Sequence, residues 1–309
     1  MNTESPSLLI AGTGAMACLF AARLSSAGIP VTILGSWPDG LEALRKTGVR
    51  AIWPDGREET YPVNVVDDPR ECQGVRFALV MVKSWQTEHV AWRLAESLDT
   101  QGLALSLQNG MGNKEILSRV LGAQRVALGS TTAGAHLLAP GVVKAVGEGV
   151  ITLGIHSRLK PLAVLLGAAG FIVDTVPDTN VLLWGKLVIN ASINPLTALL
   201  RVPNGELLER PSARNLLVAT AREAASVAVA KGVHLPYPDP VVASETIARR
   251  TADNLSSMLQ DVLRGAPTEI DAICGAIVQA GEETGVPAPI NRTLWHLVKA
   301  LGTARNPGL

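Results

Sequence analysis

The sequence predicts an α/β protein in which an N-terminal doubly wound parallel sheet is followed by an all-α C-terminal domain. Through the first half, short apolar runs alternate with helix-like segments, which is the pattern of a parallel sheet wrapped by helices. A glycine-rich stretch separates the first apolar run from the first helix-like segment. After about residue 177 only long segments with helical periodicity follow. We therefore expect two domains, at residues 1–177 and 178–309.

The expected strands of the first domain are short and apolar. Residues 8–11 read as a strand, residues 16–27 as a helix and residues 31–34 as a second strand. Runs on either side of Pro54-Asp55-Gly56 predict a hairpin. The run 77–82 is continuously apolar, as expected for a strand buried on both faces. The remaining expected strands are 103–107, 125–129 and a closing hairpin of 142–146 with 150–154 around Gly147-Glu148-Gly149.

The second domain is expected to consist of helices punctuated by proline and glycine. Pro211, Pro267 and the stretch Gly285-Val286-Pro287 separate segments of helical periodicity. The expected helices are 180–194, 212–231, 240–264, 268–284 and 291–301.

Composition excludes several classes of protein. Lysine plus arginine and aspartate plus glutamate both total 27, so the net charge is zero; this argues against nucleic-acid or membrane-surface binding, which needs excess positive charge. The three cysteines are far apart, so we expect neither disulfides nor a metal site. The uncharged run 5–22 lacks a basic segment before it and contains a Gly-Thr-Gly turn, so we read a cytoplasmic protein rather than a membrane or secreted one.

The glycine-rich stretch predicts a Rossmann-type phosphate-binding loop. It reads Gly12-Thr13-Gly14-Ala15-Met16-Ala17 between an expected strand and an expected helix. The first glycine permits the tight turn, the second lets a pyrophosphate approach the backbone, and the small third residue permits helix–strand contact. The helix N-terminus then offers unpaired N–H groups to the phosphates. We take these six residues as a dinucleotide site.

The end of the second strand favours NADP(H) over NAD(H). An NAD site usually carries a carboxylate there, but this chain reads Leu34-Gly35-Ser36-Trp37. Nothing in that stretch repels a 2′-phosphate, and Ser36 could donate to one. The arginine that usually accommodates a 2′-phosphate is also missing from that stretch. Arg45 and Lys46 either replace it or form a solvated helix face.

Two polar residues follow expected strands, where ligands bind in open α/β sheets. Lys83 follows the run 77–82 and could meet an anionic ligand. Asn109 follows the run 103–107 and could orient a nicotinamide or a carboxylate. The alternatives are that Lys83 is only a solvated strand end and that Asn109 is only a turn former.

A lysine in an apolar helix is the candidate catalytic acid. The chain has eight lysines, and Lys186 stands in a segment almost without other charge. Lys186, Asn190 and Asn194 are spaced i, i+4 and i+8, which places them on one helical stripe about 80° wide. Burial lowers a lysine pKa, and such a lysine is an effective acid toward a carbonyl oxygen that receives hydride at carbon. The alternative is a lysine that extends to solvent beside two asparagines at a proline kink.

A later polar cluster has two readings. It comprises Asn254, Ser256, Ser257 and the stretch Thr268-Glu269-Ile270-Asp271. The stretch resembles a capping box, with Glu269 at a helix start. In the functional reading Glu269 holds Lys186 or the substrate hydroxyl, and Ser257 meets a carboxylate.

These motifs resemble the ketopantoate reductase (2-dehydropantoate 2-reductase) family. The resemblance runs from the first strand to the last helix. Its most specific stretches are Lys186-Leu-Val-Ile-Asn190-Ala-Ser-Ile-Asn194-Pro-Leu-Thr-Ala198 and Ser256-Ser-Met-Leu-Gln-Asp261, and the others are the glycine loop, Val82-Lys-Ser-Trp-Gln86, Gln108-Asn-Gly-Met-Gly112, Pro203-Asn-Gly-Glu-Leu207 and Thr268-Glu-Ile-Asp271.

The resemblance implies roles for individual residues. Lys186 would donate the proton to the forming hydroxyl; that Glu269 fixes the lysine is our own hypothesis from the residues. Substrate would be bound by Asn190, Asn194, Asn204 and Ser257. The cofactor would be contacted by the glycine loop, Asn109, Ala135 and Glu269. Lys83, taken above from its place after a strand, completes the cofactor-binding residues that we expect. Ser36 departs from the family, whose members commonly carry arginine there to pair with the 2′-phosphate.

The function this implies is NADPH-dependent reduction of 2-dehydropantoate to pantoate, on the route to pantothenate and coenzyme A. A related reductase of another branched 2-oxo acid and a non-catalytic dinucleotide-sensing protein remain alternatives. The partner is then a small 2-oxo acid. The apolar surface of the helical domain could serve a homodimer or be entirely internal.

Overall fold

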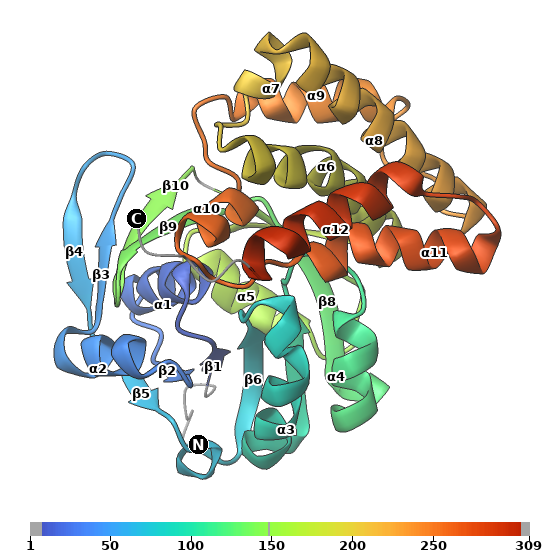
Figure 1. Cartoon of the computed structure of the whole chain (residues 1–309). Coiled ribbons are helices and arrows are strands. Elements are labelled where there is room, and N and C mark those ends of the chain that lie inside the picture. Colours follow the sequence, from blue (N-terminus) through green and yellow to red (C-terminus); the bar gives the residue numbers. More distant parts are fainter. Residues whose placement is uncertain (1–7, 148, 304–309) are drawn as a thin grey trace. The chain divides into compact units, whose positions relative to one another are not determined.

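The computed structural model describes residues 8–147 and 149–303, which form two compact units (Figure 1). Unit 1 contains the described residues up to 108 together with 113–179, and unit 2 contains 109–112 together with those from 180 onward. The first three residues of the uncharged run, 5–7, and the expected turn residue Glu148 lie outside the described residues.

The centre of unit 1 is an eight-stranded sheet with the order β12-β11-β8-β7-β6-β1-β2-β5. The six strands from β8 to β5 in this order pair in parallel, β11 is antiparallel to β8, and β12 is parallel to β11. The strands are β1 Leu8–Ala11, β2 Val31–Leu34, β5 Asn64–Val66, β6 Val75–Val80, β7 Leu98–Ser106, β8 Val126–Thr131, β11 Val150–Gly154 and β12 Ile172–Val176.

Helices cover both faces of this sheet, because side chains alternate between the faces along each strand. Leu8 and Ile10 of β1 lie in the core that contains α1 (Ala15–Ser26) and α5 (Lys160–Ala168). Leu9 and Ala11 lie in a second core with α3 (Thr87–Ser97) and α4 (Asn113–Leu121), which pack side by side (Figure 1). This arrangement confirms the doubly wound parallel sheet.

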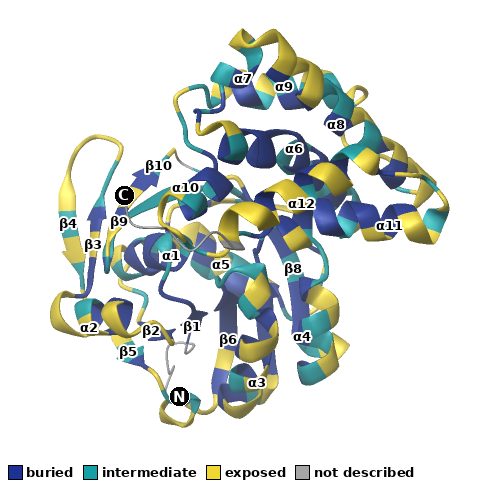
Figure 2. Ribbon diagram, in the orientation of Figure 1, coloured by how far each residue is buried: buried dark blue, intermediate teal, exposed yellow. Residues whose placement is uncertain are grey.

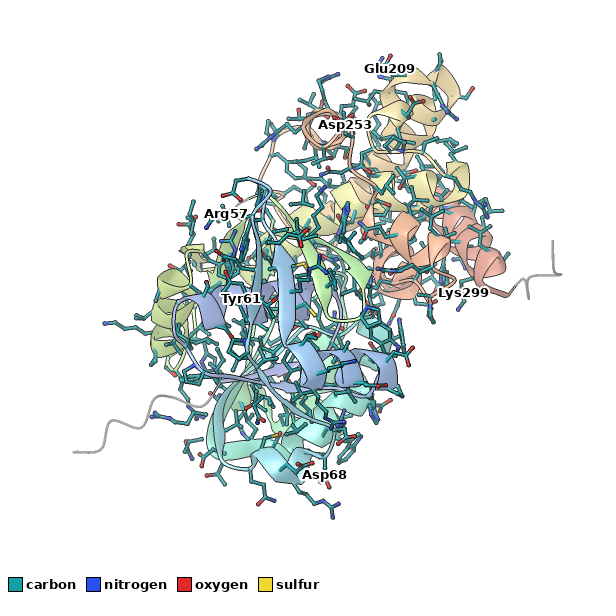
Figure 3. The ribbon with its side chains drawn as sticks, turned by 90° about the vertical axis from the view of Figure 1, so that its left-hand side faces the viewer. Arg57, Tyr61, Asp68, Glu209, Asp253 and Lys299 are labelled. Atoms are coloured by element: carbon teal, nitrogen blue, oxygen red, sulfur yellow. The ribbon has the colours of Figure 1, made fainter. Side chains whose placement is uncertain are left out.

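A smaller four-stranded sheet, ordered β4-β3-β10-β9, packs on the α1 side. Its strands are β3 Val49–Ile52, β4 Glu58–Tyr61, β9 Gly134–Ala139 and β10 Val142–Val146. The predicted hairpin around Pro54-Asp55-Gly56 is confirmed as β3–β4. Figure 3 labels Arg57 and Tyr61 on this hairpin, where the Glu59 carboxylate accepts hydrogen bonds from Trp53 Nε1 and Tyr61 Oη.

The predicted closing hairpin of 142–146 with 150–154 is wrong. β10 pairs with β9 across the turn Pro140-Gly141, where Gly141 has φ +72°. β11 instead pairs with β8 and β12 in the large sheet. The segment between β10 and β11 carries the chain from one sheet to the other, whereas the two-residue Pro-Gly turn closes the actual hairpin. Strands β5, β9 and β12 were not expected.

Unit 2 is helical in its described part, and Figure 2 shows buried residues along much of α6. The described α-helices of unit 2 are α6 Thr179–Leu200, α7 Glu206–Glu209, α8 Pro211–Ala230, α9 Pro240–Arg250, α10 Ser257–Leu263, α11 Ala276–Thr284 and α12 Pro289–Thr303. The first residue of α6 still belongs to unit 1, as does the whole of helix α2 (Pro38–Thr47). A π-helical turn, Asp271–Gly275, precedes α11. The predicted helical second domain is confirmed.

Two predicted helices need correction. The segment 240–264 is not one helix, because residues 251–256 leave the helix and hydrogen-bond elsewhere: the Asn254 and Ala252 carbonyls accept from the backbone N–H groups of Asn204 and Gly205. The segment 268–284 begins as the π-helical turn rather than as a regular helix. Among the described residues, no helix combines the length and the apolar character that a membrane span requires.

Candidate active site

The loop after β1 has the geometry of a phosphate-binding turn. Gly12 has φ +131°, a conformation that residues with a side chain rarely adopt. A Cβ on Gly12 would lie 3.0 Å from the Met81 carbonyl oxygen, at the end of β6. The Gly12 N–H donates to the Leu34 carbonyl at 2.9 Å. Glycine is therefore required where the loop passes between the ends of β2 and β6.

Helix α1 presents free backbone N–H groups to this loop. Gly14 is its N-cap, no side chain caps it, and its first turn has no acidic residue. A Cβ on Gly14 would meet no heavy atom within 4 Å, so a ligand atom has room there. Ala17 is fully buried in the core, as the third position of the motif requires. These features fit the pyrophosphate of a dinucleotide.

Polar side chains gather where β6 and β7 end. Lys83 is half-buried and stands at the N-cap of a short 3₁₀ turn, Ser84–Gln86. Buried Gln108 donates from Nε2 to the Val82 carbonyl at 3.0 Å and to Thr87 Oγ1 at 2.8 Å, and its Oε1 accepts from Ser106 at 2.9 Å. Gln108 thus fixes the backbone next to Lys83, a role that sequence reasoning missed.

Beyond the end of β2, unit 1 has a cavity of about 440 Å³, within the size range of small-molecule sites. Ser36, the expected 2′-phosphate position, is one of its lining residues. Arg45 is exposed and pairs with Asp67 at 2.9 Å. The complete lining is Gly35, Ser36, Pro38, Leu41, Glu42, Arg45, Asp67, His89 and Arg93. Arg45 therefore lies on the same cavity as Ser36, and Lys46 is not part of its lining.

In unit 2, Lys186 lies on α6 among apolar neighbours. Trp184 and Leu187 are buried, while Lys186 is half-buried. A Cβ on the adjacent Gly185 would lie 2.6 Å from Pro236, which shows how closely the chain covers this part of the helix. Desolvation lowers the pKa of Lys186 to about 8, and the charge of Glu269 acts in the opposite direction.

The predicted amide stripe exists because α6 continues through both asparagines to Leu200. Asn190 is half-buried and Asn194 is buried. One turn further, Thr197 Oγ1 and Ser256 Oγ are hydrogen-bonded at 2.7 Å. Ser256 in turn caps α10 by accepting from the Leu259 N–H at 3.1 Å. This chain of bonds ties Ser257, the first residue of α10, to the end of the stripe.

Asn204 is buried, and its amide has a determined orientation. Its Nδ2 donates to Thr251 Oγ1 at 2.9 Å. The Thr251 hydroxyl proton is already donated to the Ile247 carbonyl at 2.7 Å, so Thr251 can only accept from the amide. Asn204 Oδ1 is consequently directed away from Thr251, and it is buried without a hydrogen-bond partner among the residues that the structure describes.

Glu269 and the loop 109–112 both contact Ala272. Glu269 is buried, and its carbonyl accepts from the N–H groups of Ala272 and Ile273 at 3.1 Å. The Met111 N–H donates to the Ala272 carbonyl at 2.9 Å, and a Cβ on Gly110 would lie 2.6 Å from Ala272. The loop 109–112 therefore packs on the segment that carries Glu269, whose charge acts on Lys186.

The candidate residues fall into two groups. Unit 1 contains the glycine loop, Lys83 and Ala135, and Ala135 lies on β9 opposite Ala145. Unit 2 contains Asn109, Lys186, Asn190, Asn194, Asn204, Ser257 and Glu269. The structure brings Lys186 and Glu269 together, and the loop that begins with Asn109 packs on the segment that carries Glu269.

Comparison with known proteins identifies the family. The model of the family "Ketopantoate reductase PanE/ApbA" matches residues 8–158, and the model of its C-terminal domain matches residues 178–302. The chain belongs to the ketopantoate reductase family. Membership in this family makes it an oxidoreductase.

Individual ketopantoate reductases are similar over nearly the whole chain. A 2-dehydropantoate 2-reductase of Archaeoglobus fulgidus is 37% identical over 297 residues, which cover 94% of this chain and 96% of that protein. The crystal structure of a PanE/ApbA family ketopantoate reductase from Ralstonia eutropha JMP134 superposes with a TM-score of 0.89 at 33% identity, covering 96% of this chain and 98% of the other.

A further relative carries a different name. The ternary structure of D-mandelate dehydrogenase with NADH and anilino(oxo)acetate has a TM-score of 0.90 at 26% identity, covering 96% of this chain and 98% of that one. The same fold therefore holds a nicotinamide dinucleotide and an oxo acid in that protein.

Proposed function

We propose that this protein reduces 2-dehydropantoate to pantoate with NADPH, on the route to pantothenate and coenzyme A. The observation that carries the proposal is Lys186, a half-buried lysine with a pKa of about 8 at the head of a stripe of two asparagines. Close to neutral pH such a lysine is mostly protonated and yet gives up its proton readily, as a general acid must.

Lys186 donates its proton to the C2 carbonyl oxygen, which becomes the hydroxyl of the product. A nicotinamide cofactor bound to the chain supplies the hydride that C2 receives. One hydride and one proton convert the ketone to the alcohol, and Lys186 is left neutral until it recovers a proton from solvent. The Glu269 carboxylate favours the charged lysine and so restores it between turnovers.

The amides of α6 and the start of α10 hold the substrate. Asn190 and Asn194 follow Lys186 at one and two helical turns, so their amides orient the polar groups of a molecule whose carbonyl meets the lysine. Ser257 receives the carboxylate, supported by the hydrogen bond between Thr197 and Ser256.

Asn204 favours a substrate that carries a hydroxyl group. A buried acceptor without a partner costs free energy that a ligand donor restores, and Asn204 Oδ1 is such an acceptor. 2-Dehydropantoate has a primary hydroxyl that can donate to it. A 2-oxo acid with a hydrocarbon side chain would leave the oxygen unpaired.

The cofactor site of the proposal lies mainly in unit 1, within residues 1–177, and residues 178–309 supply the substrate groups. Gly12 to Ala17 hold the pyrophosphate, while Lys83, Asn109, Ala135 and Glu269 contact other parts of the dinucleotide. The uncapped N-terminus of α1 supports this assignment. A cytoplasmic location belongs to the proposal and is supported by the three free cysteines, which are all buried.

The test is a spectrophotometric assay of NADPH and NADH oxidation with a panel of 2-oxo acids. We expect 2-dehydropantoate with NADPH to give the highest kcat/KM. Lys186→Ala should remove most turnover while leaving NADPH binding intact. Lys231→Ala is the matched control, because Lys231 is an exposed lysine of unit 2 paired with Glu283. Near-normal turnover of Lys186→Ala would refute the assignment of the acid.

The same panel addresses the second candidate, a reductase of another 2-oxo acid, which the similarity to D-mandelate dehydrogenase favours. Preference for an acid with a hydrocarbon side chain over 2-dehydropantoate would select it. Binding of a dinucleotide without oxidation by any acid would instead indicate a sensing protein.

A further inference from the structure

The cavity beyond β2 contains an arginine that the glycine-loop motif does not predict. Arg45 lies on the last turn of α2, and its guanidinium pairs with Asp67 at 2.9 Å. Both side chains are about half exposed, at 46% and 55%. Ser36, directly beyond the end of β2, lines the same cavity.

Arg93 builds the wall of this cavity and is already committed to the backbone. Its Nη1 donates to the Gly35 carbonyl at 2.9 Å and its Nη2 to the Asp67 carbonyl at 2.5 Å. These two bonds join the segments that follow β2 and β5, which are neighbouring strands. Arg93 therefore holds Ser36 and Asp67 at the cavity, and one N–H of each terminal nitrogen is committed to the backbone.

Arg45 is in a different situation, because its partner is an exposed side chain. An exposed ion pair contributes little to stability, so opening it costs little. A phosphate offers an arginine two parallel charge-assisted hydrogen bonds. Beside a ribose at the end of the second strand, the group that distinguishes the two nicotinamide cofactors is the 2′-hydroxyl or the 2′-phosphate.

We propose that Arg45 and Asp67 together determine the cofactor preference of this protein. Arg45 leaves Asp67 to bind the 2′-phosphate of NADP(H), with the Ser36 hydroxyl as a second donor. Asp67 competes with the phosphate for Arg45, and in the ion pair it neutralises the charge that the phosphate needs. This inference rests on the proposed function, since it names the residues that distinguish NADP(H) from NAD(H).

The charges around the cavity explain why Asp67 limits this preference. Arg45 and Arg93 are the cationic side chains of the lining, and Glu42 and Asp67 are the anionic ones. The lining therefore carries two cationic and two anionic side chains beside His89. Removal of the Asp67 charge makes it net positive and leaves Arg45 free for the phosphate.

Binding of cofactor fragments tests the proposal without any substrate. The probes are 2′,5′-ADP, which carries the 2′-phosphate, and 5′-AMP, which lacks it, titrated calorimetrically into the full chain. Arg45→Gln should weaken 2′,5′-ADP by roughly 10- to 100-fold, the loss of a hydrogen-bonded charge pair, and leave 5′-AMP unchanged. Asp67→Asn should strengthen 2′,5′-ADP. The matched control is Arg50→Gln, since Arg50 is an equally exposed arginine of unit 1 paired with Glu58; it should change neither probe.

Arg45→Gln alone leaves the Asp67 carboxylate unpaired, and that carboxylate would repel the 2′-phosphate. A double variant therefore separates the loss of the Arg45–phosphate contact from this repulsion. Arg45→Gln/Asp67→Asn should still lack the preference for 2′,5′-ADP over 5′-AMP. Wild-type discrimination in the double variant, or equal weakening of both probes by Arg45→Gln, would overturn the proposal. These outcomes do not depend on 2-dehydropantoate reduction, so failure of the proposed function is seen separately in the oxo-acid assay.

Discussion

Replacement of Lys186 by methionine should abolish the reductase activity and stabilise the protein at neutral pH. Methionine keeps most of the apolar stem of the lysine and removes the charge that the helix desolvates. The pKa of Lys186 is lowered from its usual 10.5 to about 8. The charged form is therefore less favourable in the folded chain than in the unfolded chain.

The size of this stabilisation and its pH dependence follow from the linkage between proton binding and folding. A pKa difference of about 2.5 between unfolded and folded chain corresponds to about 3 kcal/mol. Because the folded pKa is the lower one, this penalty is fully present below about pH 8 and disappears as the pH rises toward 10.5. The stability advantage of Lys186→Met should then shrink by about 2 kcal/mol between pH 7 and pH 9.5.

Urea unfolding of wild type and variant at these two pH values measures the effect. The attraction between Glu269 and the charged lysine is already contained in the pKa of about 8, so the difference between the two pH values includes it. Lys231→Met on the surface of unit 2 is the control, and we expect a difference from wild type within about 0.5 kcal/mol at both pH values. A stability difference for Lys186→Met that is independent of pH, or that grows toward pH 9.5, would refute the reasoning.

Three further predictions concern turnover, the loop and the start of α10. The kcat/KM for reduction should fall about tenfold between pH 7 and pH 9 as the protonated fraction of Lys186 drops, and Glu269→Gln should move this fall to lower pH; a flat profile would contradict both. Gly12→Ala should cost about 1–3 kcal/mol of stability in thermal unfolding and should weaken NADPH binding in a fluorescence titration. An unchanged affinity for NADPH would count against the loop assignment. Thr197→Val removes the bond to Ser256, at a cost of about 1–2 kcal/mol, and should raise KM for the oxo acid more than it lowers kcat; a kcat loss at constant KM would contradict this.

Local sequence patterns were sufficient to predict the strands and the helix of the first βαβ unit. The predicted strands 8–11 and 31–34 match β1 and β2 residue for residue, and the predicted helix differs from α1 by one residue at each end. Here apolar runs, a glycine turn and a helix follow each other without interruption, so each boundary has its own signal in the sequence. The strand predicted at 77–82 lies two residues earlier, because an apolar run does not itself mark where the ladder ends.

Pairing of strands could not be predicted in the same way. The turn at Pro140-Gly141 and the glycines at 147 and 149 give similar signals, yet only the first closes a hairpin. The choice depends on β8, which supplies the partner for β11 from about twenty residues earlier in the chain. Likewise, residues 251–256 are kept out of a helix by backbone bonds to Asn204 and Gly205.

The sequence by itself determined which residues share a helical stripe: once the period of α6 is known, Lys186, Asn190 and Asn194 lie on one face whatever packs against it. Tertiary structure alone decided the environment of those groups, because desolvation and hydrogen bonding depend on neighbours from distant segments. The lowered pKa of Lys186, the buried and unpaired Asn204 Oδ1 and the ion pair of Arg45 with Asp67 each arise from such neighbours. The spacing of residues along the chain predicts which of them share a face of a helix. It does not predict the distance between residues that are far apart in the sequence and that folding brings together.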